Sequence, residues 1–271
     1  MFFTRKRFVA LAMAGITALA LLAAGCGSDS ASSDQGDIMK KIHDRGYVKV
    51  GVKEDVPLFG YKNTSTGEIE GLEVDLAKQI AKTIFNDESK VQFTPVVAKT
   101  RGPLLDSGEL DMIVATYTIN EERKKQYDFS QPYYTDPVGL LVKKDAGIQS
   151  FKDLDGKTIA IPQGATTKKV FEEAAKNAGI TIKFVEFSTY PECKAALMSG
   201  RADAYGMDKS NLAGYVDDQT EILPDAFAAQ NYGVATKKGN EALAKIVNDT
   251  ITKLKDDDGM TQLLTKWKLN R

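Results

Sequence analysis

Hydroxyl groups and a guanidinium group come close together in one stretch of the sequence. Thr116 and Thr118 end an apolar, strand-like run, and Arg123 follows five residues later. Arginine is the side chain that can grip a carboxylate with two parallel charge-assisted hydrogen bonds. This segment therefore makes Arg123 a candidate for binding a carboxylate beside the two threonines. The alternative is that residues 121–125 form a solvated helix start.

A second candidate anion site lies where a strand-like run turns into a helix-like run. Residues 163–168 read Gln-Gly-Ala-Thr-Thr-Lys, so Thr166 stands at the start of the predicted helix. The free backbone N–H groups of a helix start attract anions without any charged side chain. Thr166 is also a suitable N-cap, and the two roles are compatible because a cap leaves neighbouring N–H groups available.

Both strand ends belong to a pattern that occurs twice. The pattern Leu-x-Ser-Gly-x-x-Asp spans residues 105–111 and returns at residues 197–203, 92 residues later. In each copy a helix-like run stops at the glycine, which suits a left-handed helix stop, and an apolar strand-like run follows. These strands end at Thr116 and at Asp208. Ligands of open α/β sheets bind outside the carboxyl ends of strands, so the repeat predicts two lobes that face one cleft.

The surrounding elements follow the same order in both halves of the chain. In the first half the periodicity predicts strands 48–52, 91–97 and 110–115 with helices 72–85 and 101–106. In the second half it predicts strands 158–161, 181–187 and 202–207 with helices 166–177 and 191–198. This alternation predicts an α/β fold with parallel pairing in each lobe.

The rest of the chain must connect the two lobes. A strand-like run covers 138–143, a return strand is expected near 232–236 and a last helix near 241–255. If the chain crosses back at the return strand, the first lobe is discontinuous and two crossovers form a hinge. We therefore expect lobe 1 to comprise residues 37–132 and 231–271, and lobe 2 to comprise residues 137–229.

The first residues read as a targeting segment. Three basic residues at positions 5–7 precede an uncharged apolar stretch at 8–24, so we expect residues 1–25 to be a signal peptide. An uncleaved membrane anchor is the alternative. Residues 22–26, Leu-Ala-Ala-Gly-Cys, resemble the lipobox of bacterial lipoproteins, which implies lipidation of Cys26 and an extracytoplasmic protein anchored to the cell membrane. Residues 26–36 are polar and turn-rich, as a flexible tether should be.

Composition and charge limit the function classes. The chain has 271 residues, 42% hydrophobic and 27% charged, which is normal for a globular protein. Removal of residues 1–25, with three basic and no acidic residues, changes the net charge from −1 to −4. An acidic body argues against nucleic acid as a partner. With Cys26 lipidated, Cys193 has no partner for an intramolecular disulfide, and we expect it to be a small buried residue.

Several spaced motifs together resemble the family 3 solute-binding proteins of polar amino-acid ABC importers. The resemblance runs from about Val48 to Trp267 and includes residues 71–77, 116–134, 153–157, 201–203 and 232–233. It implies a two-lobe fold like that of type II periplasmic binding proteins, and an ABC transporter permease as partner. It also implies that Arg123 grips the ligand α-carboxylate and that Asp208 accepts the α-ammonium. We expect a monomer without a cofactor.

Other segments resemble the aspartate/glutamate-binding subset of that family, namely residues 99–105, 165–169 and 214–218. This likeness implies that Arg101 meets the ligand side-chain carboxylate with Lys53 nearby, while Thr116 and Thr118 hold the ligand main chain. The alternative is that Lys53 or Arg101 points to solvent. Tyr190 is expected to wall the pocket, to hydrogen-bond the ligand or simply to pack.

Charge and the absence of catalytic motifs favour binding over catalysis. Three cations, Lys53, Arg101 and Arg123, against Asp208 predict a positive cleft that suits an acidic amino acid. A protein for glutamine or another polar amino acid is the main alternative, and a dehydratase-like enzyme on the same scaffold is the second. The only histidine, His43, precedes the first strand, so no Ser–His or Cys–His pair is expected in the cleft.

Overall fold

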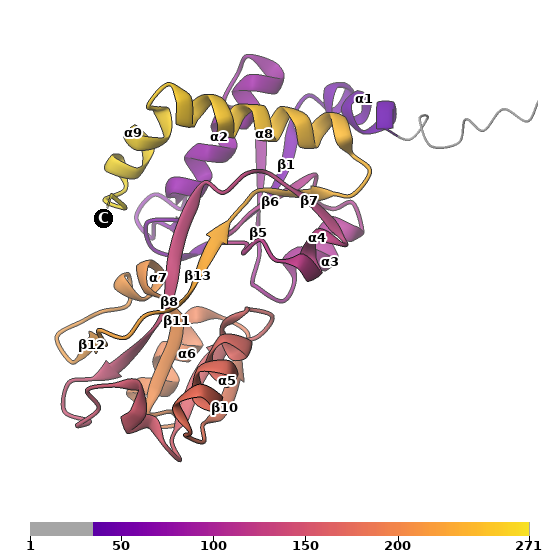
Figure 1. Ribbon diagram of the computed structural model, residues 1–271. Coiled ribbons are helices and arrows are strands. Elements are labelled where there is room, and N and C mark those ends of the chain that lie inside the picture. The colour runs from indigo at the N-terminus through magenta and orange to yellow at the C-terminus, as the bar shows by residue number, and fades with distance from the viewer. Residues whose placement is uncertain (1–34, 271) are drawn as a thin grey trace, which may run out of the picture.

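Two separate β-sheets organise the chain, one in each lobe (Figure 1). The computed structural model describes residues 35–270. The predicted signal peptide, Cys26 and most of the predicted tether lie outside the described residues. Helix α1 (Gln35–Arg45) includes the last two residues of the predicted tether.

The sheet of lobe 1 has the strand order β5-β1-β6-β14-β7. Its strands are β1 (Val48–Val52), β5 (Val91–Pro95), β6 (Met112–Val114), β7 (Tyr127–Phe129) and β14 (Ala235–Lys237). Strand β1 pairs in parallel with β5 and β6, as expected, whereas β14 runs antiparallel to β6 and β7. A small antiparallel sheet follows β1 and consists of β2 (Asp55–Val56), β3 (Gly60–Lys62) and β4 (Ile69–Glu70).

The helices of lobe 1 cover this sheet. They are α2 (Leu72–Phe85), α3 (Arg101–Asp106), α4 (Glu121–Lys124), α8 (Glu241–Asp256) and α9 (Gly259–Lys266). Helix α2 buries Leu72, Leu76 and Ile80 on one face, as the sequence spacing predicts. Helices α8 and α9, from the end of the chain, pack beside α2, so distant parts of the sequence share one hydrophobic core (Figure 1).

The sheet of lobe 2 has the strand order β10-β9-β11-β8-β12. Its strands are β8 (Tyr134–Lys143), β9 (Thr158–Pro162), β10 (Lys183–Phe187), β11 (Ala204–Asp208) and β12 (Thr220–Ile222). Strand β9 pairs in parallel with β10 and β11, while β8 runs antiparallel to β11. The helical segments are η1 (Phe151–Leu154), α5 (Thr167–Ala178), α6 (Tyr190–Met198) and α7 (Lys209–Ala213).

Two paired strands carry the chain between the lobes. Strand β13 (Phe227–Tyr232) runs antiparallel to β8 and brings Tyr232 opposite Tyr134 (Figure 1). The prediction of two α/β lobes joined by two crossovers is confirmed. The predicted single return strand 232–236 is wrong, because the chain breaks between β13 and β14, which belong to different sheets. Gly233 lies at this break, where a Cβ would come within 2.7 Å of Ile119.

The repeated motif is a scaffold device in both lobes. Gly108 and Gly200 adopt left-handed backbone conformations with φ of +80° and +77°. The terminal aspartate of each copy then anchors the neighbouring parallel strand. The Asp111 carboxylate accepts a hydrogen bond from the N–H of Lys49 at 2.7 Å, and that of Asp203 accepts one from the N–H of Thr158 at 2.8 Å.

Most predicted elements begin and end within two residues of the observed bounds. Strand β8 differs, because it starts at Tyr134 rather than at residue 138. Its first residues pair with β13 rather than with β11 or β12, and residues 134–137 do not form the continuous apolar run of a central strand. Cys193 is fully buried on α6 as a free thiol, which confirms the expectation for it.

Candidate ligand-binding site

A cavity of about 810 Å³ lies between the two lobes. Lobe 1 contributes Thr118 and Arg123 to its lining, and lobe 2 contributes Gly164 and Thr166, with Gln230 from β13. Three of the eight predicted ligand-binding residues therefore line one cavity. The other five, Lys53, Arg101, Thr116, Tyr190 and Asp208, are all at most 3% exposed.

Arg123 reaches across the cleft from α4. Asn120 starts this short helix by accepting a hydrogen bond from the Arg123 N–H at 2.8 Å. The guanidinium donates through Nη1 to the carbonyl of Thr118 at 2.8 Å and through Nη2 to the carbonyl of Gly164 at 3.3 Å. Burial, followed by the nearby charge of Arg101, lowers the pKa of Arg123 to about 10. The rest of α4 is exposed, but Arg123 itself points into the cleft.

Arg101 is buried at the start of α3, so the solvent-facing alternative is wrong for it. Its Nη1 donates to the carbonyls of Ala115 and Thr116, the latter at 3.3 Å. Its Nε is buried and has no hydrogen-bond partner among residues 35–270. The ring of Tyr117 lies 4.2 Å from the guanidinium of Arg101 and 4.3 Å from that of Arg123, so it contacts both cations.

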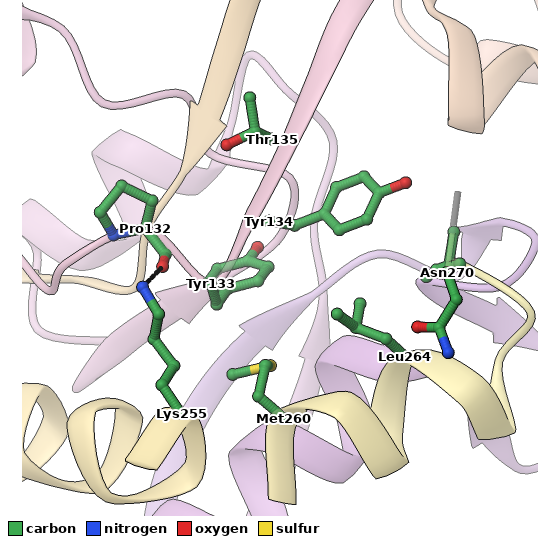
Figure 2. Close-up of a pocket in the computed structure, with 9 residues that line it drawn as sticks. Pro132, Tyr133, Tyr134, Thr135, Lys255, Met260, Leu264 and Asn270 are labelled. Atoms are coloured by element: carbon green, nitrogen blue, oxygen red, sulfur yellow. Dashed lines mark hydrogen bonds between the residues drawn. The ribbon is translucent and has the colours of Figure 1, made fainter. Parts of the chain in front are cut away.

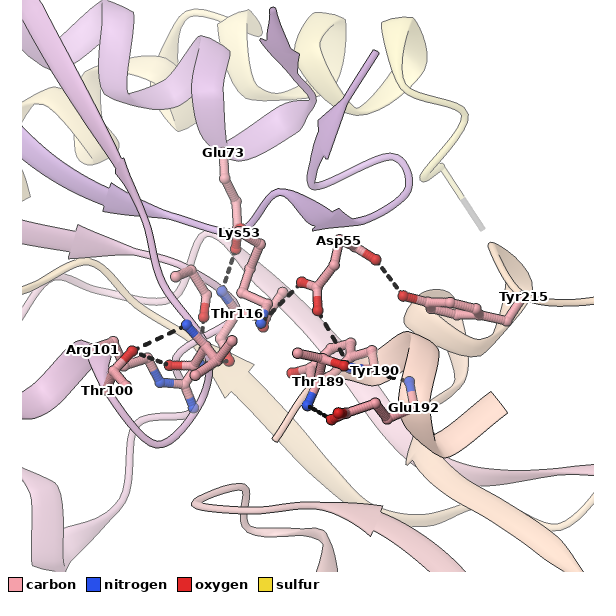
Figure 3. Close-up of polar contacts among 12 residues, drawn as sticks. Lys53, Asp55, Glu73, Thr100, Arg101, Thr116, Thr189, Tyr190, Glu192 and Tyr215 are labelled. Carbon is pink, nitrogen blue, oxygen red and sulfur yellow. Dashed lines mark hydrogen bonds and ion pairs between the residues drawn. The ribbon is translucent and has the colours of Figure 1, made fainter. Parts of the chain in front are cut away.

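Lys53 follows the last residue of β1 and is also fully buried, which excludes the solvent-facing alternative. Its Nζ forms an ion pair with Asp55 Oδ1 at 3.1 Å and lies 4.1 Å from the centre of the Tyr190 ring. Burial lowers the pKa of Lys53, and the Asp55 carboxylate opposes this shift. Figure 3 shows Lys53 and Asp55 beside Tyr190.

Asp55 links the lobes on this side of the cleft (Figure 3). Its Oδ2 accepts a hydrogen bond from the N–H of Tyr190 at 3.3 Å, and its carbonyl accepts one from the hydroxyl of Tyr215. Close by, Pro57 of lobe 1 touches Gly214 of lobe 2, where a Cβ would lie 2.7 Å from the proline ring. Tyr190 is therefore buried at the lobe boundary, with its ring packed against the Lys53 ammonium.

Asp208 ends β11 and provides the acidic group of lobe 2. Its Oδ2 accepts a hydrogen bond from the hydroxyl of Tyr232, whereas Oδ1 is buried without a partner among the described residues. Burial raises the pKa of Asp208 to about 7, while the Tyr232 hydrogen bond and the charges of Arg101 and Arg123 lower it. An ammonium group is a suitable partner for this oxygen.

The three threonines differ in what they offer. Thr116 has a left-handed backbone with φ of +43°, which is strained for a β-branched residue. The carbonyl of Thr118 is occupied by Arg123. Thr166 is the N-cap residue of α5, but its side chain forms no cap hydrogen bond, so that part of the prediction is wrong. Its hydroxyl donates instead to Gln230 Oε1 at 2.7 Å, because β13 brings that acceptor within reach.

Four residues of this region were not predicted, namely Asp55, Glu73, Tyr117 and Tyr232. Glu73 had a detectable signal, because it occupies the same helical stripe as Leu76 and Ile80 and is therefore an acid on an apolar face. The predicted positive charge of the cleft also left out some of the carboxyl groups near it. Besides Asp208, the region contains the buried carboxyl groups of Glu73 and Asp136 and the partly buried one of Asp55, so the cations are not in excess.

A second cavity, of about 790 Å³, lies on the lobe 1 side of the crossover (Figure 2). It is lined by Pro132–Thr135 and by residues of α8, α9 and the chain end. Lys255 closes one side by donating to the carbonyl of Pro132 at 3.2 Å. None of the predicted ligand-binding residues lines this cavity, so it is separate from the interlobe site.

The model of the bacterial extracellular solute-binding proteins, family 3, matches residues 48–270. The chain belongs to this family. Membership confirms the type II periplasmic-binding-protein fold, and it makes the protein an amino-acid ABC transporter substrate-binding protein of an extracytoplasmic family. Between residues 35 and 270, no helix is both long enough and apolar enough to cross a bilayer.

Named relatives of this family 3 protein bind different amino acids. The ABC transporter glutamine-binding protein GlnH of Bacillus subtilis is 41% identical, over 97% of each chain. The glutamine-binding protein of Geobacillus stearothermophilus is 36% identical, over 90% of this chain and 97% of its own. An L-glutamate/L-aspartate-binding protein of Pseudomonas aeruginosa is 29% identical, over 84% of this chain and 79% of its own. These names do not single out the aspartate/glutamate subset.

Solved structures show the same fold. The solute receptor for L-cysteine of Neisseria gonorrhoeae matches with a TM-score of 0.78 and 28% identity, over 84% of this chain and 92% of its own. An ancestral amino acid-binding protein, described as a precursor of cyclohexadienyl dehydratase, matches with a TM-score of 0.75 and 33% identity, over 85% and 99%. The relatives of this family 3 protein are transport proteins, and the dehydratase likeness enters only at the level of an ancestral binding protein.

Proposed function

We propose that the protein binds an acidic amino acid, aspartate or glutamate, between its lobes and delivers it to an ABC permease. The observation that carries this proposal is the pair Arg101 and Arg123. Neither guanidinium forms an ion pair with a carboxylate of residues 35–270, and their hydrogen bonds go to backbone carbonyls. A desolvated cation without a direct carboxylate partner is costly, and Glu73 acts on Arg101 only without an ion-pair contact, so a ligand with two carboxylates would give each guanidinium a partner.

The proposed contacts divide the ligand between the lobes. Arg123 takes the α-carboxylate, with Thr118 and the N-terminal end of α5 at Thr166 beside it. Asp208 takes the α-ammonium through its unpaired Oδ1. Arg101 and Lys53 take the side-chain carboxylate, Thr116 adds its hydroxyl, and the Tyr190 ring forms the wall. Contacts from both lobes favour the closed form, which is the form a permease would recognise.

Membrane attachment completes the proposed function. The lipobox-like segment ending at Cys26 supports a lipid anchor, and the polar residues that follow support a tether between the membrane and the lobes. We propose that the protein acts as an extracytoplasmic monomer. Metabolic labelling with a palmitate analogue tests the anchor, since Cys26→Ser should abolish both labelling and membrane retention.

Glutamine is the second candidate ligand. The names of two relatives favour it. The ion pair between Lys53 and Asp55 favours it as well, because a side-chain amide can donate to a carboxylate and accept from an ammonium or a guanidinium. Such a ligand would leave one of the two guanidinium groups without a direct carboxylate partner.

Titration calorimetry of the mature protein with aspartate, glutamate, glutamine, cystine and arginine distinguishes these ligands. We expect Arg101→Ala to weaken the acidic ligands by about ten- to a hundredfold and to affect glutamine less, because only an acid loses a charge-assisted hydrogen bond. Arg123→Ala should weaken every amino acid. Lys99→Ala is the matched control, since it removes an exposed cation from the same cavity rim. Tight glutamine binding with no response to either acid contradicts the proposal.

A chemical readout addresses the enzyme alternative. We expect each ligand to be recovered unchanged after incubation with the protein, as followed by chromatography. Conversion of any ligand would support the dehydratase-like alternative instead.

A further inference from the structure

Glu73 is a fully buried acid next to the ligand-binding residues. It lies in the first turn of α2, and Figure 3 shows its side chain descending toward Thr116 and Lys53. Its Oε1 accepts two hydrogen bonds, from the N–H of Thr116 at 2.5 Å and from the hydroxyl of Tyr133 at 2.5 Å. Its Oε2 is buried and has no partner among the described residues.

The contact with Thr116 gives Glu73 a positioning role. Thr116 has a left-handed backbone that a β-branched residue adopts only when its surroundings hold it there. Glu73 holds the N–H of this residue, and Arg101 holds its carbonyl at 3.3 Å. The two side chains thereby fix the backbone of Thr116 just after the end of β6.

The charge of Glu73 is balanced by groups from several elements. Lys53 from the end of β1 and Arg101 from α3 face it as cations, and Tyr133 from the chain before β8 faces it as a hydrogen-bond donor. Burial raises the pKa of Glu73 to about 7, whereas Tyr133, Thr116, Arg101 and Lys53 all lower it. Both the charged and the neutral form of this carboxyl are therefore accessible near neutral pH.

We propose that Glu73 is a positioning residue that sets the choice between an acidic and an amide ligand through its charge. A neutral Glu73 leaves the charge of Arg101 free for a ligand carboxylate, whereas an ionised Glu73 repels a second carboxylate and tolerates an amide. This inference rests on the proposed function, because it requires that the ligand side chain lies beside Arg101.

The ratio of the two dissociation constants, glutamine over glutamate, measures this effect. Changes at Asp208 cancel in the ratio, because both ligands carry the same ammonium. We expect the ratio to rise about tenfold as the pH falls from 8.5 to 6, since Glu73 loses a unit charge beside the cation proposed to hold the ligand carboxylate. Glu73→Gln keeps an oxygen acceptor for Thr116 and Tyr133 but carries no charge, so its ratio should be high and independent of pH.

Tyr133→Phe is a second variant, which tests whether the hydrogen bond to Glu73 sets the midpoint. It removes one hydrogen bond that lowers the pKa of Glu73, so the midpoint of the ratio should move to higher pH while its amplitude remains. A role confined to packing would move neither the midpoint nor the slope. If Glu73→Gln keeps the wild-type pH dependence, another group such as Lys53 is responsible, and the inference is overturned.

Proton uptake tests the inference without any variant. Calorimetry at pH 7 in two buffers of different ionisation enthalpy should show glutamate taking up about half a proton more per protein than glutamine does. Equal uptake overturns the role of Glu73. If the wild-type protein binds glutamine and neither acid, the proposed function fails. The role of Glu73 is then tested by Glu73→Gln. If this variant does not bind glutamate, the inference is overturned.

Discussion

The hydroxyl of Tyr232 donates a hydrogen bond to the carboxylate of Asp208. Tyr232 ends the second strand that crosses between the lobes, and Asp208 ends the central strand of lobe 2. The acid proposed for the ligand ammonium is therefore held directly by the hinge. Because the hydrogen bond stabilises the ionised form of Asp208, the hinge also tunes the charge that meets the ligand.

Tyr232→Phe should weaken the binding of every amino acid by about tenfold at pH 7. The variant loses a hydrogen bond that lowers the pKa of Asp208, so a smaller fraction of this group is ionised to receive the ammonium. Titration calorimetry measures the change. Tyr205→Phe is the control, since the hydroxyl of that buried tyrosine has no hydrogen-bond partner in the described part of the chain. A selective effect on one ligand would be inconsistent with a role at the shared ammonium.

Glutamine affinity should rise about tenfold between pH 6 and pH 8. The pKa of Asp208 is raised to about 7, so the ionised fraction of the free protein is small at pH 6 and large at pH 8. Binding of the ammonium requires the ionised form of Asp208, so glutamine affinity increases as the pH rises. Dissociation constants measured across this range test the expectation, and a constant value would show that Asp208 does not titrate there.

Gly214→Ala should weaken all ligands by about tenfold or more. Gly214 has an ordinary helical backbone, so alanine adds no backbone strain, but its Cβ would come within 2.7 Å of Pro57 across the cleft. The substitution therefore penalises the closed form alone, by the cost of overpacking. The double variant Gly214→Ala with Pro57→Gly should recover affinity. An unchanged dissociation constant for the single variant would mean that the bound form does not bring these residues together.

Asp203→Ala should lower the free energy of unfolding by about 1–3 kcal/mol, because the N–H of Thr158 loses its acceptor at the start of β9. Ligand selectivity should stay the same, since the motif anchors the scaffold rather than the ligand. Chemical denaturation and calorimetry measure the two quantities. Asp256→Ala, at an exposed position of α8, controls for loss of a carboxylate. A changed ratio between glutamate and glutamine would contradict the scaffold role.

Sequence periodicity predicted the fold well because its causes are local. The apolar stripe of α2 and the glycine stops at Gly108 and Gly200 act within a few residues, so the elements they define are visible in the sequence. The break between β13 and β14 depends on which sheet each segment joins. That choice is made by residues 89 to 124 positions away, so the sequence predicted one strand where there are two.

The site was predicted less completely than the fold, for a related reason. Arg101 stood out as a cation in a family-like segment and Asp208 as an acid at the end of the strand that follows the repeat, and both are buried. Asp55 was missed because its importance comes from Tyr190 and Tyr215, which reach it only across the lobe boundary. Tyr232 was missed because one hydroxyl in an aromatic-rich strand carries no signal of its partner.

The anchors made by Asp111 and Asp203 have a consequence for how such a protein can change over evolutionary time. Each holds its strand at the end far from the ligand, so strand register does not depend on the residues that follow Val114 or Met207. Substitutions at those tips can then alter what is recognised at little risk to folding. A lineage can exchange one nutrient for another while the framework that performs the closing movement is inherited intact.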